Sequence, residues 1–302
     1  MNRPTALEFR SILFIPADAQ RFIAKAASRG ADAIVLDLED GVAPSAKSAA
    51  RDALGAATRQ LREAGVFVFV RVNNAPELLE ADLQAAVACG ADGIVMPKVE
   101  HATELESLDR ELLKEEESAG RAKDSMRVLA LIETPIGVLN ATAISTASLR
   151  LSGVCFGSED FATAMGVEAI PEALAWPAHA VAVSAVAAGV QPLGLPGSVA
   201  NFSDLPVYRD LVLRAKRIGM RGATCIHPAQ VAVLNEVFGS SDEEVAAAER
   251  LLAAFDAAVA QGKGAISVDG KMVDEPIANR ARALLERRRR TESGKKFSGQ
   301  ST

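Results

Sequence analysis

The chain has 302 residues, of which 49% are hydrophobic and 24% are charged, and its net charge is −6. This composition is typical of a globular protein with a large core, and it excludes collagen-like and intrinsically disordered chains. Residues 287–302 carry six basic side chains and one acid, so the remainder has a net charge of −11, which argues against a nucleic-acid surface on the fold.

Eight short apolar runs recur along the chain, at residues 11–16, 33–38, 66–72, 93–97, 128–132, 153–156, 191–195 and 222–226. Continuous runs of this length are typical of strands that are buried on both faces, as in a parallel sheet. A helical pattern follows each run, at about residues 18–29, 45–64, 77–89, 101–119, 135–147, 171–188, 204–218 and 228–238. Eight alternating units predict an α/β fold, the (β/α)8 TIM barrel.

No linker interrupts the repeating units, so we expect residues 1–302 to form a single domain. The barrel core is predicted at residues 10–240, and a C-terminal helical extension at 241–290. Residues 291–302 are expected to be a disordered tail. The basic run that begins at Arg287 fits a solvated, frayed terminus better than a nucleic-acid or membrane patch.

The compartment is predicted from three absences in the sequence. No uncharged apolar run reaches about 18 residues, so no membrane-spanning helix is expected. Residues 1–9 lack the apolar stretch of a signal peptide. Cys89, Cys155 and Cys225 lie far apart and form no Cys-x-x-Cys pair, which favours free thiols. We therefore expect a cytoplasmic protein that binds no membrane.

Polar and charged residues, whose burial costs free energy, occur where the predicted strands end. They are Glu39 and Asp40 after the second strand, Arg71 and Asn73 at the third, Lys98 after the fourth, Glu133 after the fifth, residues 157–160 after the sixth and His227 after the eighth. In a TIM barrel, catalytic residues stand at the carboxyl ends of the strands. Since charged side chains are expensive to bury, their concentration there predicts the functional site.

Glu133 and Asp160 follow neighbouring strands, so their carboxylates can reach one point. Two oxygen ligands completed by water are typical of Mg²⁺, and the lack of an adjacent His or Cys disfavours zinc. The turn at residues 157–159 can offer backbone N–H groups to a substrate carboxylate. Arg71 suits a carboxylate, a thioester oxygen or a developing enolate.

Structural roles for the same residues remain open. Glu133 and Asp160 could be buried acids that Arg71 or backbone donors balance, and Arg71 could form an ion pair with Asp37 or Glu39.

Two further residues at the strand ends have equally simple structural explanations. Lys98 fits a solvated position at the rim as well as a phosphate contact. His227 fits a helix cap or a packing role better than a general base.

Seven segments resemble, in order, the citrate lyase beta-subunit-like branch of the aldolase/citrate lyase family of CoA-ester lyases. They are RSILFIPA, AIVLDLEDGVAPSAK, VFVRVN, GIVMPKVE, LIETPIGVLNA, VCFGSEDFATAMG and CIHPAQV. The likeness spans roughly residues 10–290. It implies a Mg²⁺-dependent TIM barrel, a homotrimer or a dimer of trimers. It also implies a substrate thioester of CoA or an acyl carrier protein, of the citryl, malyl or citramalyl type.

The resemblance also implies roles for single residues. Glu133 and Asp160 would hold Mg²⁺, Arg71 would contact the substrate and the enolate oxygen, and the amides of residues 157–159 would hold the carboxylate of a 2-oxo acid. In the segment GKMVDEP, Asp274 would reach a neighbouring subunit and act as the base, although an N-cap would look the same in sequence. The substrate-binding candidates are Arg71, Glu39, Gly157, Ser158 and Glu159, and the catalytic candidates are Arg71, Asp40 and Asp274.

Two departures from the relatives bear on the reaction. Related pyruvate aldolases carry Asp-x-Glu-His after the second strand, whereas this chain has acid in place of histidine at Asp40. The departure favours the thioester branch. The loop after Pro16 also lacks the glycine–asparagine of many relatives, so the acyl carrier or its binding could differ.

The sequence therefore predicts a Mg²⁺-dependent carbon–carbon lyase that gives an acyl thioester and a 2-oxo acid. The alternatives are a hydroxyacyl-CoA thioesterase, a malate-synthase-like activity at the same site, and a lyase subunit that needs partner chains.

Overall fold

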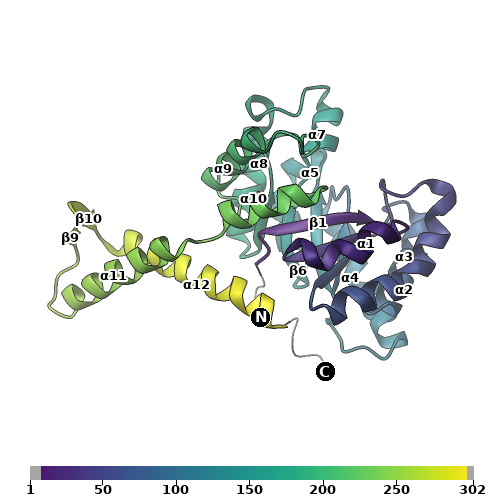
Figure 1. The fold of residues 1–302 in the computed structure, drawn as a ribbon, viewed down its shortest axis with the longest axis horizontal. Helices are drawn as coiled ribbons and strands as arrows, with labels where there is room; N and C mark the ends of the chain where they lie inside the picture. The colour runs from purple at the N-terminus through teal and green to yellow at the C-terminus, as the bar shows by residue number, and fades with distance from the viewer. Residues whose placement is uncertain (1–7, 298–302) are drawn as a thin grey trace.

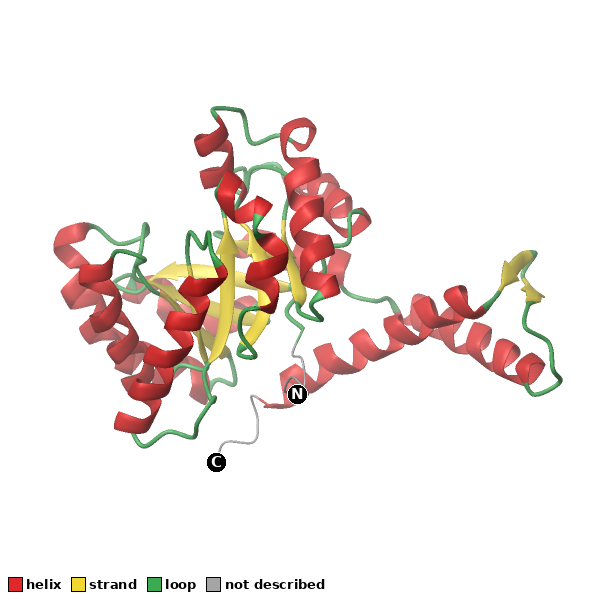
Figure 2. Cartoon of the chain, turned by 180° about the vertical axis from the view of Figure 1, so that it is seen from behind, coloured by secondary structure: helices red, strands yellow, loops and turns green. Residues whose placement is uncertain are grey.

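The computed structural model of the chain describes residues 8–297, with side chains through residue 291. A sheet of eight parallel strands lies at its centre, surrounded by helices (Figures 1 and 2). The strands are β1 (Ser11–Pro16), β2 (Ala33–Asp37), β3 (Phe67–Arg71), β4 (Gly93–Met96), β5 (Arg127–Ile132), β6 (Leu151–Phe156), β7 (Gln191–Gly194) and β8 (Ala223–Cys225). Each begins and ends within two residues of its predicted range.

The sheet curls into a nearly closed barrel. β1 pairs with β2 on one side and with β8 on the other, and the remaining strands follow in chain order to β7. Two backbone hydrogen bonds bridge β7 and β8, from Gly194 N to Gly222 O at 3.0 Å and from Arg221 N to Pro192 O at 2.9 Å. The predicted (β/α)8 TIM barrel is confirmed.

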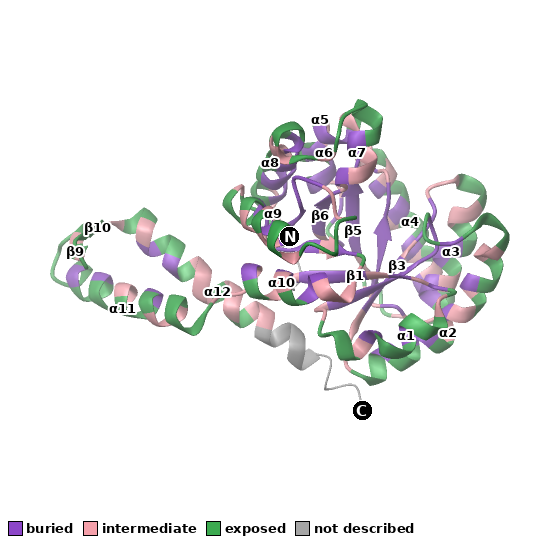
Figure 3. Ribbon diagram, turned by 45° about the horizontal axis from the view of Figure 1, so that its top comes forward, coloured by how far each residue is buried: buried purple, intermediate pink, exposed green. Residues whose placement is uncertain are grey.

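Apolar side chains occupy both faces of the strands, which are buried inside a shell of helices (Figure 3). Because side chains alternate along a strand, Val35 points into the barrel while Ile34 packs against the helices. Three aromatic rings, those of Phe9, Phe67 and Phe69, fill the amino-terminal end of the barrel with centroids 4.9–5.5 Å apart.

The helices around the barrel are α1 (Gln20–Ala26), α2 (Lys47–Glu63), α3 (Pro76–Ala88), α4 (Ala102–Ser118), α5 (Pro135–Leu139), α6 (Ala141–Thr146), α7 (Ser158–Met165), α8 (Pro171–Ala187), α9 (Leu205–Arg217) and α10 (Pro228–Phe238). Helix α7 was not predicted, since eight residues directly after a strand leave too little room for a periodic pattern. Across residues 8–297, no helix is both long and apolar enough to cross a bilayer.

The last part of the chain forms an arm that projects from the barrel (Figure 1). It consists of α11 (Asp242–Val259), a hairpin of β9 (Ile266–Val268) and β10 (Lys271–Val273), and α12 (Glu275–Phe297). Phe255, Val273 and Ala278 form its small core. α12 continues to Phe297, so residues 291–297 of the tail predicted from residue 291 are helical in the structure; residues 298–302 lie outside the described part.

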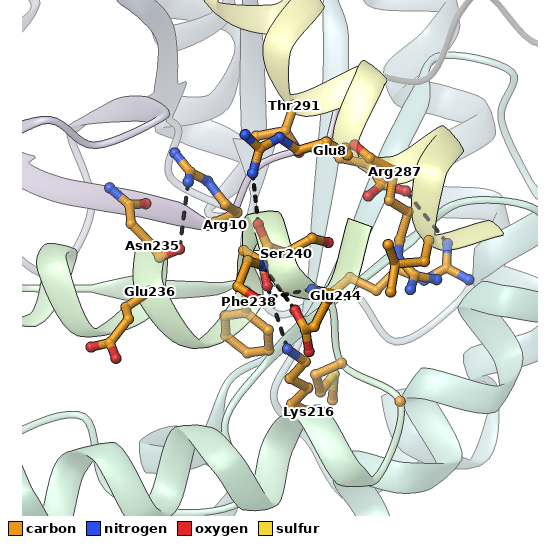
Figure 4. A pocket seen from close by; sticks show the side chains of 17 residues that line it. Glu8, Arg10, Lys216, Asn235, Glu236, Phe238, Ser240, Glu244, Arg287 and Thr291 are labelled. Carbon is orange, nitrogen blue, oxygen red and sulfur yellow. Dashed lines mark hydrogen bonds and ion pairs between the residues drawn. The ribbon is translucent and has the colours of Figure 1, made fainter. Parts of the chain in front are cut away.

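The basic run of α12 contacts the amino-terminal end of the barrel. Arg288 donates hydrogen bonds to Ser240 O at 2.6 Å and to Asp242 Oδ1 at 3.1 Å, and Arg290 lies 3.9 Å from the buried carboxylate of Glu8. Arg287, Ser240 and Glu8 line a cleft of about 570 Å³ between the arm and the barrel (Figure 4). These contacts correct the prediction of a frayed, solvated terminus for this part of the run.

Candidate active site at the barrel mouth

The carboxyl ends of the strands converge on a region that we call the barrel mouth, made of residues 37–40, 71–73, 98, 133 and 157–160. Six of these residues are acidic and two are basic. The surplus of negative charge makes the barrel mouth attractive to cations.

Asp37 and Arg71 form an ion pair at the centre of the barrel mouth. They lie side by side in the register of β2 and β3, and both guanidinium contacts to Asp37 are short, at 2.6 Å and 2.7 Å. Asp37 also accepts the backbone N–H groups of Glu39 and Gly41, each at 2.9 Å. Burial opposes the charge of Arg71, but Asp37 and Glu39 outweigh it and raise the pKa of the guanidinium. The guanidinium of Arg71 therefore has a fixed position and a permanent positive charge.

Glu39 is buried between two cations. Its Oε2 lies 2.6 Å from Arg71 Nη1, and its Oε1 lies 2.6 Å from Lys98 Nζ. Burial raises the pKa of Glu39, although Arg71 and Lys98 oppose the change. Burial would also raise the pKa of Asp40, but Lys98, at 3.3 Å, outweighs it and lowers that pKa. The structural alternative for Arg71, an ion pair with Asp37 or Glu39, is confirmed for both acids.

Glu133 and Asp160 come together at the barrel mouth from β5 and α7, on adjacent units of the barrel. Glu133 is only 4% exposed, and its Oε1 accepts the backbone N–H of Lys98 at 2.8 Å. Burial and the neighbouring charge of Asp160 raise the pKa of Glu133 to about 7. Asp160 Oδ2 lies 3.9 Å from Lys98 Nζ. Burial and a second acid both disfavour the ionised form of Glu133, and a bound cation would favour it.

These two carboxylates fit a Mg²⁺ ion. Magnesium is usually held by one or two carboxylates, with water and substrate oxygens in its other positions. Among residues 8–297, no three His, Cys, Asp or Glu side chains form a group that could hold a metal alone, so a closed structural zinc site is not formed there. A divalent cation bound beside Glu133 would lower its raised pKa again.

The start of α7 lies beside Glu133, but one of the three backbone amides predicted to bind a substrate carboxylate is already used within the sheet. The Gly157 N–H donates to Ile132 O at 2.9 Å, which continues the pairing of β5 and β6. This bond corrects the expectation that the Gly157 amide is available to a substrate. The amides of Ser158 and Glu159 stand in the first turn of α7, where helix geometry leaves N–H groups without partners.

Glu159 directs its side chain away from the other acids. Its Oε1 accepts hydrogen bonds from Ser198 Oγ at 2.5 Å and from Val199 N at 3.0 Å, in the loop after β7. The carboxylate therefore fixes that loop, and only its backbone amide remains a substrate-binding candidate.

Asp274 is not brought to the barrel mouth of its own chain. It precedes α12 on the projecting arm, where its Oδ1 accepts the Ile277 N–H at 3.3 Å (Figure 1). The N-cap alternative is thus realised, while a role in a neighbouring subunit stays a prediction. His227 caps α10 by accepting the Ala229 N–H at 3.2 Å, so the structural interpretation of this histidine is confirmed.

Three residues important to the geometry were not predicted as site residues. Asp37 was considered only as a possible partner of Arg71. Lys98 was left undecided, and Lys47 was not considered. Lys47 Nζ donates to Leu38 O, Glu39 O and Asn73 Oδ1 at 2.7–3.0 Å and so fixes the loop after β2. A polar residue inside an apolar strand was the available signal for Asp37.

Replacing Gly157 with alanine adds only one methyl group, but it should weaken metal binding at the barrel mouth. A β-carbon there would lie 2.5 Å from Glu133 Oε2 and 2.7 Å from Glu133 Cβ, so the carboxylate would have to move. We expect divalent-cation affinity to fall at least about tenfold, since ligand placement sets affinity. Calorimetric titration with Mg²⁺ measures it. Gly55→Ala, where a β-carbon meets nothing within 4 Å, is the matched control; equal affinities in both variants would contradict the prediction.

Comparison with known proteins places the chain in a family. Residues 10–228 match the model of the HpcH/HpaI aldolase/citrate lyase family. The chain is 34% identical to citrate lyase subunit beta of Escherichia coli over 92% of each protein. It is 37% identical to a (3S)-malyl-CoA thioesterase of Cereibacter sphaeroides over 92% of this chain and 93% of that protein. The solved structure of CitE from Mycobacterium tuberculosis with magnesium, acetoacetate and coenzyme A is 29% identical, with a TM-score of 0.72 over 95% of this chain and 99% of that one. A match over most of the chain, together with the barrel and its acidic mouth, makes this protein a member of the HpcH/HpaI aldolase/citrate lyase family.

Proposed function

We propose that the chain is a Mg²⁺-dependent carbon–carbon lyase. Its substrate is a 3-hydroxyacyl thioester of CoA or an acyl carrier, of the citryl, malyl or citramalyl type, and its products are an acyl thioester and a 2-oxo acid. The observation that carries the proposal is the pair Glu133 and Asp160, two acids crowded at the barrel mouth beside a fixed arginine. Relatives named citrate lyase subunit beta support the reaction class.

Glu133 and Asp160 would hold the metal, which supplies a Lewis acid for the oxygen atoms of the 2-oxo acid when bound. Ser158 and Glu159 would donate their backbone N–H groups to the carboxylate of that acid, because the start of a helix favours anions. The substrate is thereby oriented with its thioester toward Arg71.

In the cleavage direction, the substrate hydroxyl would lose its proton to the solvent, and the carbon that bears this oxygen becomes the new carbonyl carbon. The bond to the carbon next to the thioester breaks, and its electron pair passes into a thioester enolate. Arg71 would stabilise the negative oxygen of this enolate, since its charge is permanent and its position fixed. Protonation of the enolate carbon then gives the acyl thioester.

The proton donor in this scheme is Asp274 from a neighbouring subunit. Asp274 stands on the projecting arm, away from the barrel mouth of its own chain (Figure 1). A homotrimer or a dimer of trimers would allow the arm to reach another barrel. Asp40, at the rim of the mouth, is the candidate within the same chain.

A second candidate function is thioester hydrolysis, which the 37% identity to a (3S)-malyl-CoA thioesterase favours. Both reactions can be tested with the purified chain on malyl-, citramalyl- and citryl-CoA, with Mg²⁺ or EDTA, by mass spectrometry. A 2-oxo acid with a shortened acyl-CoA supports the lyase. Intact hydroxy acid with free CoA supports the thioesterase. No turnover of any ester with Mg²⁺ present would count against both and favour a subunit that needs partner chains.

A further inference from the structure

Lys98 adopts a backbone conformation that is unusual for its residue type. Its φ is 52°, in the left-handed region, and only Asp124 and Asp269 share this feature among the non-glycine residues of 8–297. Aspartate tolerates that region because its short side chain can bond locally, whereas in lysine the β-carbon is placed too close to the following carbonyl oxygen. Such a conformation persists only where the surrounding contacts require it.

The conformation places the Lys98 N–H against one of the proposed metal ligands. That N–H donates to Glu133 Oε1 at 2.8 Å, and the next residue, Val99, continues the sheet by donating to Leu131 O at 3.0 Å. One turn of the backbone thus serves both the pairing of neighbouring strand ends and the orientation of the Glu133 carboxylate.

The ammonium of Lys98 faces three further acids of the barrel mouth. It lies 2.6 Å from Glu39 Oε1, 3.3 Å from Asp40 Oδ2 and 3.9 Å from Asp160 Oδ2. Asp37 is not among them, because both of its oxygens are taken by Arg71 and backbone amides, and Glu159 is not, because its carboxylate bonds to the loop after β7. Lys98 is therefore the residue that touches all four remaining carboxylates of the central barrel mouth.

The distances divide these four acids into two pairs. The ammonium is close to Glu39 and Asp40, and it stands at the edge of ion-pair distance from Asp160. Without that positive charge, Glu39 would keep its contact with Arg71 through Oε2, but its Oε1 would be left beside the Asp40 carboxylate with no cation. An unpaired carboxylate oxygen beside a second carboxylate is a donor set that attracts a divalent cation.

We propose that Lys98 is a positioning residue that restricts the barrel mouth to one divalent cation. Its ammonium occupies Glu39 and Asp40, while its N–H presents Glu133, so that only Glu133 and Asp160 take a metal ion. The inference deepens the proposed function and rests on its metal site.

The test is the number of Mn²⁺ ions bound per chain, measured by titration calorimetry and by the electron paramagnetic resonance of free Mn²⁺. Mn²⁺ replaces Mg²⁺ because both prefer oxygen ligands. The wild type should bind one ion. Lys98→Met keeps the β-carbon and the N–H but removes the charge, and it should bind two. Lys98→Arg should restore one ion, since the charge returns; Lys98→Gln provides a second neutral variant if the methionine variant does not fold.

Lys114 supplies the matched control. It lies on the surface of α4, 3.8 Å from Glu111 and 4.0 Å from Glu115, and Lys114→Met also removes a lysine from between two acids. That variant should still bind one ion.

The outcomes separate the inference from the proposed function. One ion in both neutral Lys98 variants, with an unchanged Kd, overturns the role of Lys98 alone. A wild type that binds no divalent ion overturns the metal site and the inference together.

Discussion

Glu133→Gln is expected to abolish Mg²⁺-dependent turnover, with kcat/KM falling by at least roughly a thousandfold. Glutamine keeps the shape of the side chain and the acceptor for the Lys98 N–H, but it removes the charge that a divalent cation needs. The assay is cleavage of the best thioester at saturating Mg²⁺, together with a calorimetric Kd for Mg²⁺. Both the affinity and the rate should be lost.

The same substitution should stabilise the metal-free protein at high pH. Burial and Asp160 raise the pKa of Glu133 from 4.5 to about 7. Below pH 4.5 the carboxyl is protonated in both states, so its contribution to stability is fully present. As pH rises from 4.5 through 7, the unfolded chain releases the proton first, and that contribution is lost. The full loss is on the order of 3 kcal/mol.

In EDTA at pH 8, Glu133→Gln should therefore melt several degrees above the wild type, and the difference should vanish near pH 4.5. Differential scanning calorimetry at the two pH values measures it. Glu172→Gln, a change of an exposed acid on α8, is the control and should leave both Tm and turnover unchanged. Full activity of the Glu133 variant, or a lower Tm in EDTA at pH 8, would refute the assignment of Glu133.

Arg71→Lys should lower kcat by roughly 10²–10³-fold while Mg²⁺ still binds. The substitution keeps the positive charge, so the electrostatic balance of the carboxylates changes little. A lysine cannot reproduce the fork that contacts both oxygens of Asp37 and reaches Glu39 at 2.6 Å. Transition-state stabilisation by a fixed donor depends on that placement, and loss of one such donor has effects of this size.

The rate loss must be separated from a loss of stability, because Arg71 also holds the buried Asp37. We expect the free energy of unfolding to fall by about 1–3 kcal/mol in Arg71→Lys. Arg150→Lys is the matched control: Arg150 makes an equally short, forked contact with the buried Glu116, at 2.8 Å and 2.7 Å, before β6 at the amino-terminal end of the barrel. It should lose comparable stability with kcat within about twofold. Equal losses of kcat in both variants would make Arg71 a structural residue only.

The location of the candidate site was predictable from the sequence, but the hydrogen bonds and ion pairs within it were not. Glu133, Asp160 and Arg71 could be placed together because the end of each apolar run marks where a strand leaves the sheet. The same rule gave Glu159 a place at the barrel mouth, yet its carboxylate bonds to Ser198 and the loop after β7. Position at a strand end fixes where a residue stands, whereas the direction of its side chain depends on partners far away in the chain.

The sequence by itself determined the order of eight strands and their helices, the barrel they form, and the end at which charge accumulates. These properties follow from local periodicity and from the cost of burying charge, which each segment carries independently of its neighbours. Only the tertiary structure decided that Lys98 touches four acids, that the Gly157 amide is used within the sheet and that the basic run of α12 contacts the base of the barrel. Those outcomes depend on distances between residues that the chain brings together only on folding, because ion pairs and hydrogen bonds act over a few ångströms and not along the sequence.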